Sequence, residues 1–261
     1  MVIPRKQRST QEDWTATLED AYARPDRARA DDLVGRAAEA LRARLSDAAR
    51  PAYGWSGGKD SQGLRIVADA AGLTTAVSVI SELEYPAFLE WLTDNMPHDC
   101  WVEDVGLDLD WLRLHPEMLF PDGPHAAKWF SLLQHSGQRA YCRSEGCDLL
   151  VLGRRTADGN FIGRGENEYV DRGGFIRYSP IADWTHEDLL CVLGAHASPL
   201  PPCYWWPRGF RVGTGPWPAR QWCPDRAAGW AEVTEIDPRV TELAAEANIP
   251  GAEEALCAAS S

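Results

Sequence analysis

Residues 54–61, with the sequence GWSGGKDS, bring glycines, hydroxyls, an ammonium group and a carboxylate into one short turn. The apolar residues 52–56 predict a strand before this turn, and residues 61–71 predict a helix after it. A glycine-rich turn that ends at a helix N-terminus directs several backbone N–H groups at one point, which suits a phosphate. We therefore expect a nucleotide-binding loop here.

This loop departs from the Walker pattern, G-x-x-x-x-G-K-[ST], of common nucleotide triphosphatases. Tyr53 stands where the first glycine belongs, and Asp60 stands where the Ser or Thr belongs. Because a carboxylate repels phosphate, we expect Asp60 either to bind Mg²⁺ that accompanies the phosphates or to cap the following helix. Gly57 and Gly58 allow the backbone to approach a ligand closely.

Lysine is rare in this chain, which has 23 Arg and only 3 Lys, at positions 6, 59 and 128. A lysine ammonium is a compact charge on a flexible stem, whereas the arginine guanidinium is planar and broad. The presence of Lys59 inside the glycine loop therefore indicates a functional need for a point charge, and we expect it to contact phosphate.

The composition is that of an ordinary soluble globular protein, with 261 residues, 44% hydrophobic and 25% charged. No apolar run is long enough for a membrane helix, and residues 1–14 lack the apolar stretch of a secretory signal. We expect a cytoplasmic protein with no membrane association. The net charge of −13 argues against direct nucleic-acid binding. A homo-oligomer or a partner subunit is left open.

Strands and helices alternate along the middle of the chain, which predicts an α/β class. Beyond the elements around the loop, we expect strands over 74–81, 99–106, 147–155 and 175–183, and helices over 85–96 and 185–196. This order predicts a Rossmann-like three-layer fold with a roughly five-stranded, mainly parallel sheet.

We expect three parts in the chain. Residues 1–50 form a helical N-terminal extension, in which Ser9-Thr10-Gln11-Glu12 has capping-box spacing. Residues 51–196 form the nucleotide-binding α/β domain. Residues 197–261 form a substrate or lid loop and a helical tail, since 197–228 are rich in Pro, Gly, Trp and Arg without periodicity.

The spacing S-G-G-x-D-S at 56–61 resembles the PP-loop of the ATP pyrophosphatases, also called adenine nucleotide alpha hydrolases. The segments GRRTADG (153–159) and SPIADWTHEDLLCVLG (179–194) resemble the phosphoadenosine phosphosulfate (PAPS) reductase family within that superfamily. The likeness covers roughly residues 50–220. It implies that the loop holds the β,γ-pyrophosphate of ATP, with Mg²⁺, while a small-molecule acceptor attacks the α-phosphorus.

The same resemblance implies a set of site residues. The β,γ-phosphates would be held by Ser56, Gly57, Gly58, Lys59 and Ser61. Catalysis would rest on Lys59, Asp60, Arg154 and Arg155, where the two arginines meet the α-phosphate or an anionic acceptor at the end of a strand, next to Gly153. The candidates for ribose, metal or helix-cap roles are Asp158 and Asp183. The candidates for closing over the acceptor are Arg208, Arg211 and Arg220.

Plainer interpretations stand beside these roles. Arg154 and Arg155 are typical of a solvated surface pair as well. Asp183 and its neighbours suit the packing and capping of the helix that follows, whose start at 185–188 has capping-box spacing. His186 and His196 suit exposed positions on that helix and receive no role. The tryptophans of 197–228 suit core or lid packing, with base stacking as the alternative.

The cysteines decide between branches of the family. The only cysteine of the C-terminal tail, Cys257 in EALCAASS, lacks the Glu-Cys-Gly-x-x-His context of the reductases. No pair has C-x-x-C spacing, although Cys142 and Cys147, together with Cys203 and Cys223 on either side of a loop, leave an iron–sulfur cluster open. Since reductases often lose the loop lysine and this chain keeps Lys59, we favour ATP-dependent adenylyl transfer. The alternatives are a sulfonucleotide reductase and a non-catalytic nucleotide-binding subunit.

Overall fold

The computed structural model describes residues 9–121, 123–220 and 225–259, and of residues 123, 124 and 220 it describes the backbone only. The chain divides into two units. Unit 1 comprises Met1–Ser78, Asn95–Glu103 and Gln138–Pro201, and unit 2 comprises Val79–Asp94, Asp104–Gly137 and Pro202–Ser261. Each unit is assembled from separate stretches of the chain, so these units are not the three consecutive parts expected from the sequence. The expected division at residues 50 and 196 stays a prediction.

Six strands form one sheet in the order β3-β2-β1-β4-β6-β5. They are β1 (Pro51–Gly54), β2 (Ala76–Ile80), β3 (Cys100–Asp104), β4 (Leu149–Val151), β5 (Glu168–Val170) and β6 (Ile176–Tyr178). β1 pairs in parallel with β2 and with β4, and β4 pairs in parallel with β6. Only the short β5, which the sequence did not predict, is known to run antiparallel, against β6. The expected α/β class with a mainly parallel sheet is confirmed.

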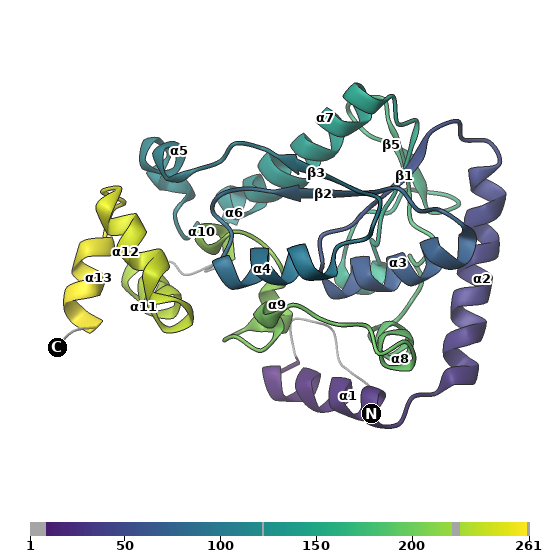
Figure 1. The fold of residues 1–261 in the computed structure, drawn as a ribbon, viewed down its shortest axis with the longest axis horizontal. Coiled ribbons are helices and arrows are strands. Elements are labelled where there is room, and N and C mark those ends of the chain that lie inside the picture. Colours follow the sequence, from purple (N-terminus) through teal and green to yellow (C-terminus); the bar gives the residue numbers. More distant parts are fainter. Residues whose placement is uncertain (1–8, 122, 221–224, 260–261) are drawn as a thin grey trace. The chain divides into compact units, whose positions relative to one another are not determined.

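The helices of unit 1 cover both faces of this sheet. They are α1 (Gln11–Ala23), α2 (Arg27–Leu45), α3 (Lys59–Ala71), most of α7 (Ser136–Glu145), the 3-10 turn η3 (Thr156–Asp158) and α8 (His186–Ala195). α3 and α7 lie on opposite faces (Figure 1), and α2 and α8 pack against α3. This layering is the Rossmann-like arrangement that alternating strands and helices predict.

The core of unit 1 forms because apolar side chains of the strands meet those of the helices. One buried cluster consists of Ala52, Val77, Tyr141, Cys142, Cys147, Leu150 and Leu152, with Phe175 packed against it. Cys142 and Cys147 therefore serve as small core residues. No three or more His, Cys, Asp or Glu side chains of the described residues gather into a group that could hold a metal ion. An iron–sulfur cluster thus has no support in this part of the chain, while Cys223 lies outside the described residues.

Unit 2 is mainly helical. Its helices are α4 (Pro86–Asn95), α5 (Leu109–Leu114), η1 (Pro116–Met118), α6 (Gly123–Phe130), the π-helical η2 (Ser131–His135), η4 (Pro202–Tyr204), α9 (Gly209–Val212), α10 (Trp217–Arg220), α11 (Arg226–Ile236), α12 (Pro238–Glu246) and α13 (Ala252–Ala259). The expectation of an irregular segment over 197–228 is wrong in part, because three short helices lie within it. Trp217 is buried against Phe120 and Trp230, which confirms packing rather than exposure for that tryptophan.

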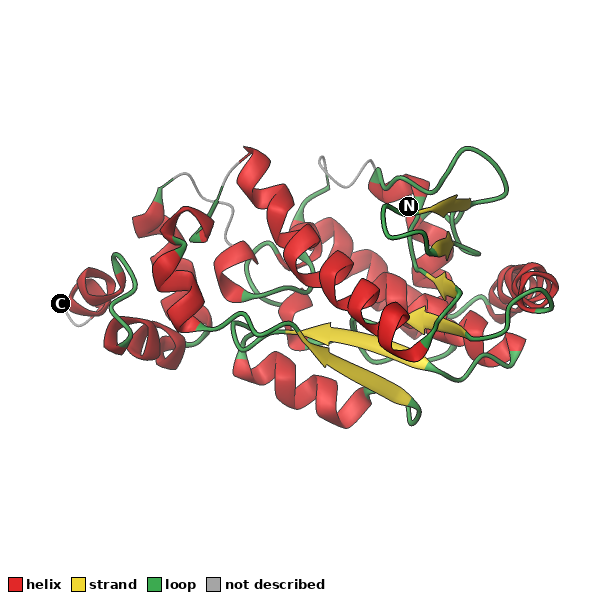
Figure 2. Ribbon diagram, turned by 90° about the horizontal axis from the view of Figure 1, so that it is seen from above, coloured by secondary structure: helices red, strands yellow, loops and turns green. Residues whose placement is uncertain are grey.

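Helices outnumber strands throughout the described chain, as Figure 2 shows. The longest, α2, has 19 residues, and charged side chains recur along its whole length. Across residues 9–121, 123–220 and 225–259, none of the helices combines the length and the apolar character that a membrane crossing needs.

Candidate functional site

The glycine loop lies where the order of the strands reverses. β1 has β2 on one side and β4 on the other, so the chain winds outward from β1 in both directions. In open parallel sheets, ligands bind at this point, outside the carboxyl ends of the strands. The two loops that flank it here follow β1 and β4, and both carry residues that the sequence singled out.

The loop after β1 has the backbone geometry of an anion cradle. Gly57 has a φ of 70°, a conformation that favours glycine, and Gly58 is the N-cap of α3 without any side-chain cap. The first-turn N–H groups of α3 therefore have no capping side chain as acceptor. Ser61 Oγ donates to the Gly58 carbonyl at 2.8 Å and accepts from Ser56 N at 3.2 Å, which braces the turn. The alternative that Asp60 caps α3 is wrong, because Gly58 occupies the cap.

Gly153 brings the loop after β4 against the first turn of α3. A Cβ atom at this position would lie 2.7 Å from the Asp60 carbonyl oxygen and 2.9 Å from its carbon. Real Cβ atoms do not approach backbone so closely, so only glycine lets the two loops meet. Gly153 thus lets the two loops approach backbone to backbone, while its expected part in binding a nucleotide stays a prediction.

Lys59 is buried and ion-paired in this structure. Its side chain is 2% exposed, and its Nζ lies 2.9 and 2.8 Å from Asp60 Oδ1 and Oδ2 and 3.6 Å from Asp158 Oδ1. The same ammonium lies 5.8 Å from the centre of the Trp14 ring. Burial raises the pKa of Asp60, but the charges of Lys59 and Arg155 outweigh it and hold that pKa well below its usual range. Asp60 is therefore ionised.

Arg155 has a partner for every one of its guanidinium donors. Its Nε donates to Asp60 Oδ1 at 2.7 Å. One terminal nitrogen donates to the carbonyls of Trp184 and Thr185 at 3.1 and 2.9 Å, and the other lies 2.7 Å from Asp158 Oδ2 and 3.3 Å from His186 Nδ1. Because the side chain is fully buried, these contacts join the loops after β1 and β4 to the start of α8. Arg155 is not a solvated surface residue.

Arg154 lies in a different setting, although it is adjacent in sequence. Its guanidinium is half-buried over the ring of Tyr169, at 5.6 Å from the ring centre, and one nitrogen donates to the Phe161 carbonyl at 3.3 Å. Burial lowers its pKa from the ordinary arginine value. The two adjacent arginines therefore differ in setting: Arg155 is buried and connects the surrounding segments, whereas Arg154 is a partly accessible cation.

The two acidic candidates, Asp158 and Asp183, also lie in different settings. The Asp158 side chain is 5% exposed and joins the Lys59–Asp60–Arg155 cluster, so it belongs to the site. Asp183 is exposed and stands outside that cluster of contacts. A capping role for Asp183 is wrong, because Thr185 is the N-cap of α8 and forms the predicted capping box with Asp188.

Two residues of this cluster were missed from the sequence. His186, expected to be an exposed helix residue, is 5% exposed, and its ring lies edge-on to Trp14 at 4.8 Å between centres. Trp14 comes from α1, in the part expected to be an extension. No local pattern indicates either role, since Trp14 and His186 contact each other across 172 positions of the chain.

His186 gives the cluster a pH-dependent contribution to stability. Burial, followed by the charge of Arg155, lowers the pKa of His186 from 6.5 to about 4. The unfolded chain therefore binds a proton that the folded chain excludes between these values. We expect stability to fall as the pH falls through this window, by up to about 1.4 kcal/mol per pH unit. Urea unfolding at pH 7 and pH 5 should show a larger loss for the wild type than for His186→Asn.

Exposed His196, at the other end of α8, supplies the control. His196→Asn should leave the wild-type pH dependence unchanged. Comparing each variant with the wild type cancels the effect of Glu84 in unit 2, whose pKa burial raises to about 8 and which acts in the opposite direction. Equal pH dependence in the wild type and His186→Asn would contradict the assignment.

The arginines of the 197–228 segment belong to unit 2, and their expected closure over the site stays a prediction. Arg208 stands at the N-cap of α9 with a φ of 54° and pairs with Glu232 at 2.5 Å. Arg211 is exposed. Arg220 ends α10, and its side chain lies outside the described residues.

Comparison with known proteins rests on structure alone. A scan of family models finds no match, and no curated protein is similar in sequence. The PAPS reductase of Candida auris, solved as a phosphate complex, superposes with a TM-score of 0.52 over 72% of this chain and 94% of its own, at 13% identity. The fold is that of the PAPS reductases. The expected PAPS reductase-like fold is thereby confirmed.

A second solved structure is also similar. The U34-tRNA thiolase NcsA of Methanococcus maripaludis, which carries a [4Fe-4S] cluster, matches with a TM-score of 0.42 at 13% identity, over 97% of this chain and 80% of its own. At 13% identity, the likeness to the PAPS reductase concerns the fold and does not indicate a reaction.

Proposed function

We propose that this chain binds ATP at the loop 56–61 and transfers the adenylyl group to a small-molecule acceptor, releasing pyrophosphate. One observation carries the proposal: Gly58 caps α3 without a side chain at the reversal point of the sheet, beside the loop after β4. The dipole and N–H groups of a 13-residue helix favour an anion at this end. The retained SGGKDS spacing favours pyrophosphate as that anion.

The residues of the cluster then take distinct parts. Backbone N–H groups of the loop, with Ser56, would hold the β,γ-phosphates of ATP. Lys59 lies in the first turn of α3 next to them, and a modest change of its rotamer would move its ammonium from Asp60 to a phosphate oxygen. Arg155 acts as a positioning residue, because it holds Asp60 and Asp158 in place. Arg154 would supply the cation at the α-phosphate.

Magnesium enters this proposal only with the nucleotide. Both oxygens of Asp60 accept bonds from Lys59, and one of them also accepts from Arg155, so this arrangement does not present Asp60 as a ready metal ligand. Protein sites seldom cage Mg²⁺ by themselves and more often bind it through substrate phosphates. Bound to ATP, the ion would neutralise charge on the departing pyrophosphate.

The proposal is tested by titrating ATP with Mg²⁺ calorimetrically and by analysing the products of a long incubation. We expect saturable binding and release of pyrophosphate, with AMP as the other product when water reacts and the adenylylated acceptor as the other product when an added acceptor reacts. Lys59→Met should weaken ATP binding by about 10- to 100-fold, the effect of losing a charged hydrogen bond. Lys128→Met, at an exposed position on α6, is the matched control and should bind as the wild type does.

A second variant keeps the test decisive if Lys59→Met fails to fold. Ser56→Asp places a carboxylate at the half-buried entrance of the loop, where it should repel phosphates without emptying the core. Absence of ATP binding by the wild type would overturn the proposal. ADP and phosphate as products would contradict cleavage at the α-phosphorus. Release of sulfite from PAPS with thioredoxin would instead favour the reductase, for which Cys257 on α13 is the tail thiol.

A further inference from the structure

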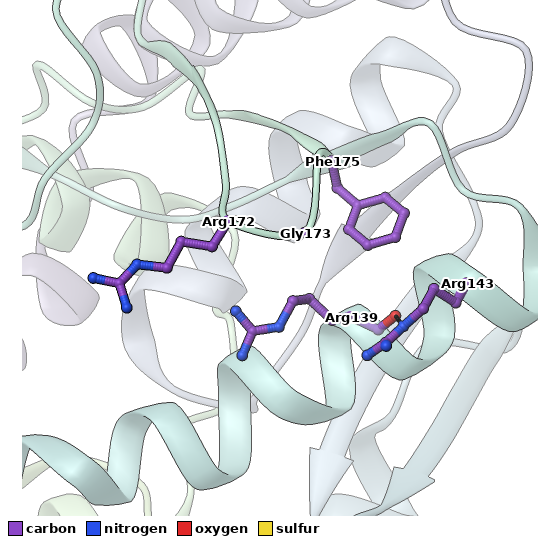
Figure 3. A pocket seen from close by; sticks show the side chains of 5 residues that line it. All are labelled: Arg139, Arg143, Arg172, Gly173 and Phe175. Atoms are coloured by element: carbon purple, nitrogen blue, oxygen red, sulfur yellow. Dashed lines mark hydrogen bonds between the residues drawn. The ribbon is translucent and has the colours of Figure 1, made fainter.

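A pocket of about 290 Å³ lies between α7 and the turn that joins β5 to β6. It is lined by Arg139 and Arg143 of α7 and by Arg172, Gly173 and Phe175 of the turn. Figure 3 shows Arg139 and Arg172 extending to the same side from the two walls, with Arg143 one helical turn further along α7. Three of the five lining residues are thus permanent cations, and none is acidic.

These three arginines carry charge that the protein leaves uncompensated. Among the residues that the structure describes, no carboxylate forms an ion pair with Arg139, Arg143 or Arg172. At least one does so with each of Arg44, Arg155, Arg177 and Arg208. The chain has 39 Asp and Glu against 26 Lys and Arg, so acidic partners are plentiful. Like charges gathered around one pocket repel one another unless an anion lies between them.

The turn that carries Arg172 is rigidly built. Asp171 Oδ1 accepts from the backbone N–H groups of Gly173 at 2.7 Å and Phe175 at 3.2 Å. Its Oδ2 accepts from Arg177 Nε at 3.1 Å and from a terminal nitrogen of Arg177 at 2.7 Å. Arg177 is buried and neutralises Asp171, so this carboxylate orders the turn without cancelling the charge of Arg172. Such support is what a binding site needs for a fixed geometry.

The pocket lies away from the nucleotide loop. Strand register aligns Pro51 of β1 with Leu149 of β4, and Leu149 with Ile176 of β6, at the amino ends of these parallel strands. The β5–β6 turn leads into Ile176, so it lies at the amino edge of the sheet. The loop after β1 leaves from the opposite, carboxyl edge. A ligand in this pocket therefore occupies a second site, and the inference goes beyond the proposed function.

We propose that this pocket binds a small phosphate- or sulfate-bearing anion. Arginine forks match the planar pairs of oxygens that phosphate and sulfate present, and two forks from facing walls can engage one anion. The half-buried ring of Phe175 provides an apolar surface for the rest of a small ester. The volume suits a compact ligand at the lower end of small-molecule pockets. The net charge of −13 disfavours an extended nucleic acid as the occupant.

The proposal is tested by calorimetric titration at low ionic strength with inorganic phosphate, sulfate and AMP as separate probes. Each probe is titrated into the wild type, Arg172→Ala, and Arg139→Ala/Arg172→Ala. We expect binding of at least one probe, weakened about tenfold or more for each arginine removed. Phosphate or sulfate alone would identify a site for the free oxyanion, and AMP binding more tightly than both would identify a phosphate ester that uses Phe175.

Matched variants separate this site from the loop and from general charge. Arg36→Ala, at an exposed surface pair on α2, should bind every probe as the wild type does. Lys59→Met should retain phosphate binding here even where it loses ATP, so failure of one proposal leaves the other intact. Unchanged affinity in the double variant, or no binding of any probe, would overturn the inference. So would salt-sensitive binding of a single-stranded RNA that depends on Arg139 while the small anions do not bind.

Discussion

Replacing Arg155 by Met is expected to destabilise the protein by about 3–5 kcal/mol, the usual cost of removing one partner from a buried ion pair. The methionine would leave Asp60 Oδ1 and Asp158 Oδ2 without their 2.7 Å donors, and it would remove the arginine donor from the carbonyls of Trp184 and Thr185, of which Thr185 keeps its bond from Leu189 N. Lys59 alone would then face both carboxylates. Urea unfolding at pH 7 measures the loss directly.

The adjacent residue offers a matched control for that substitution. Arg154→Met removes one 3.3 Å hydrogen bond and a stacking contact with Tyr169 from a half-buried position. We expect it to cost about 1 kcal/mol or less, close to the value of an exposed charge. If the two variants lost the same stability, the central role of Arg155 in holding the loops together would be wrong.

The contrast between these arginines marks the limit of what the sequence could predict. Both follow the same strand, and the pattern gave them one shared role at a phosphate. Strand register then decides which side chain turns into the protein, and register depends on residues that are distant in sequence. The strand expected over 147–155 is also shorter, at Leu149–Val151, because the chain turns at Gly153 to meet α3.

Local rules worked best where the chemistry is local. The capping box before α8 is present as predicted, and the glycine at the end of α3, Gly72, has a φ of 84°. The box expected at Ser9 is displaced by one residue, because Thr10 is the N-cap and Asp13 completes it. Both Ser and Thr are favoured N-cap residues, so spacing alone could not separate these neighbours.

Lys59 illustrates a limit of composition as evidence. Composition can indicate that a residue is important, but it does not show what role the residue has. Its rarity pointed to a special position, and the structure places it in the centre of a cluster. The cluster itself needs Trp14 and His186, which approach Lys59 from α1 and α8. Such long-range contacts have no signature in a single sequence, so the N-terminal part looked like an extension.

The second large effect is expected from Gly153→Ala. The new methyl group would lie 2.7 Å from the Asp60 carbonyl oxygen, and neither backbone segment can yield as a flexible side chain would. Overpacking of this kind costs about 1–3 kcal/mol. Because the displaced atoms belong to the first turn of α3, we also expect ATP binding to weaken by about tenfold, an expectation that rests on the proposed function.

Gly35→Ala is the control for the change in stability expected from Gly153→Ala. A glycine-to-alanine change restricts the unfolded chain, which by itself favours the folded state where the new side chain fits. Gly35 lies within α2 with nothing within 4 Å of its added Cβ. Gly35→Ala should therefore raise stability by up to about 1 kcal/mol and leave ATP binding unchanged. Gly153→Ala gains the same entropic term, so a net loss of stability measures the steric contact between the two loops. A net gain there would mean that the loops after β1 and β4 do not touch as the structure places them.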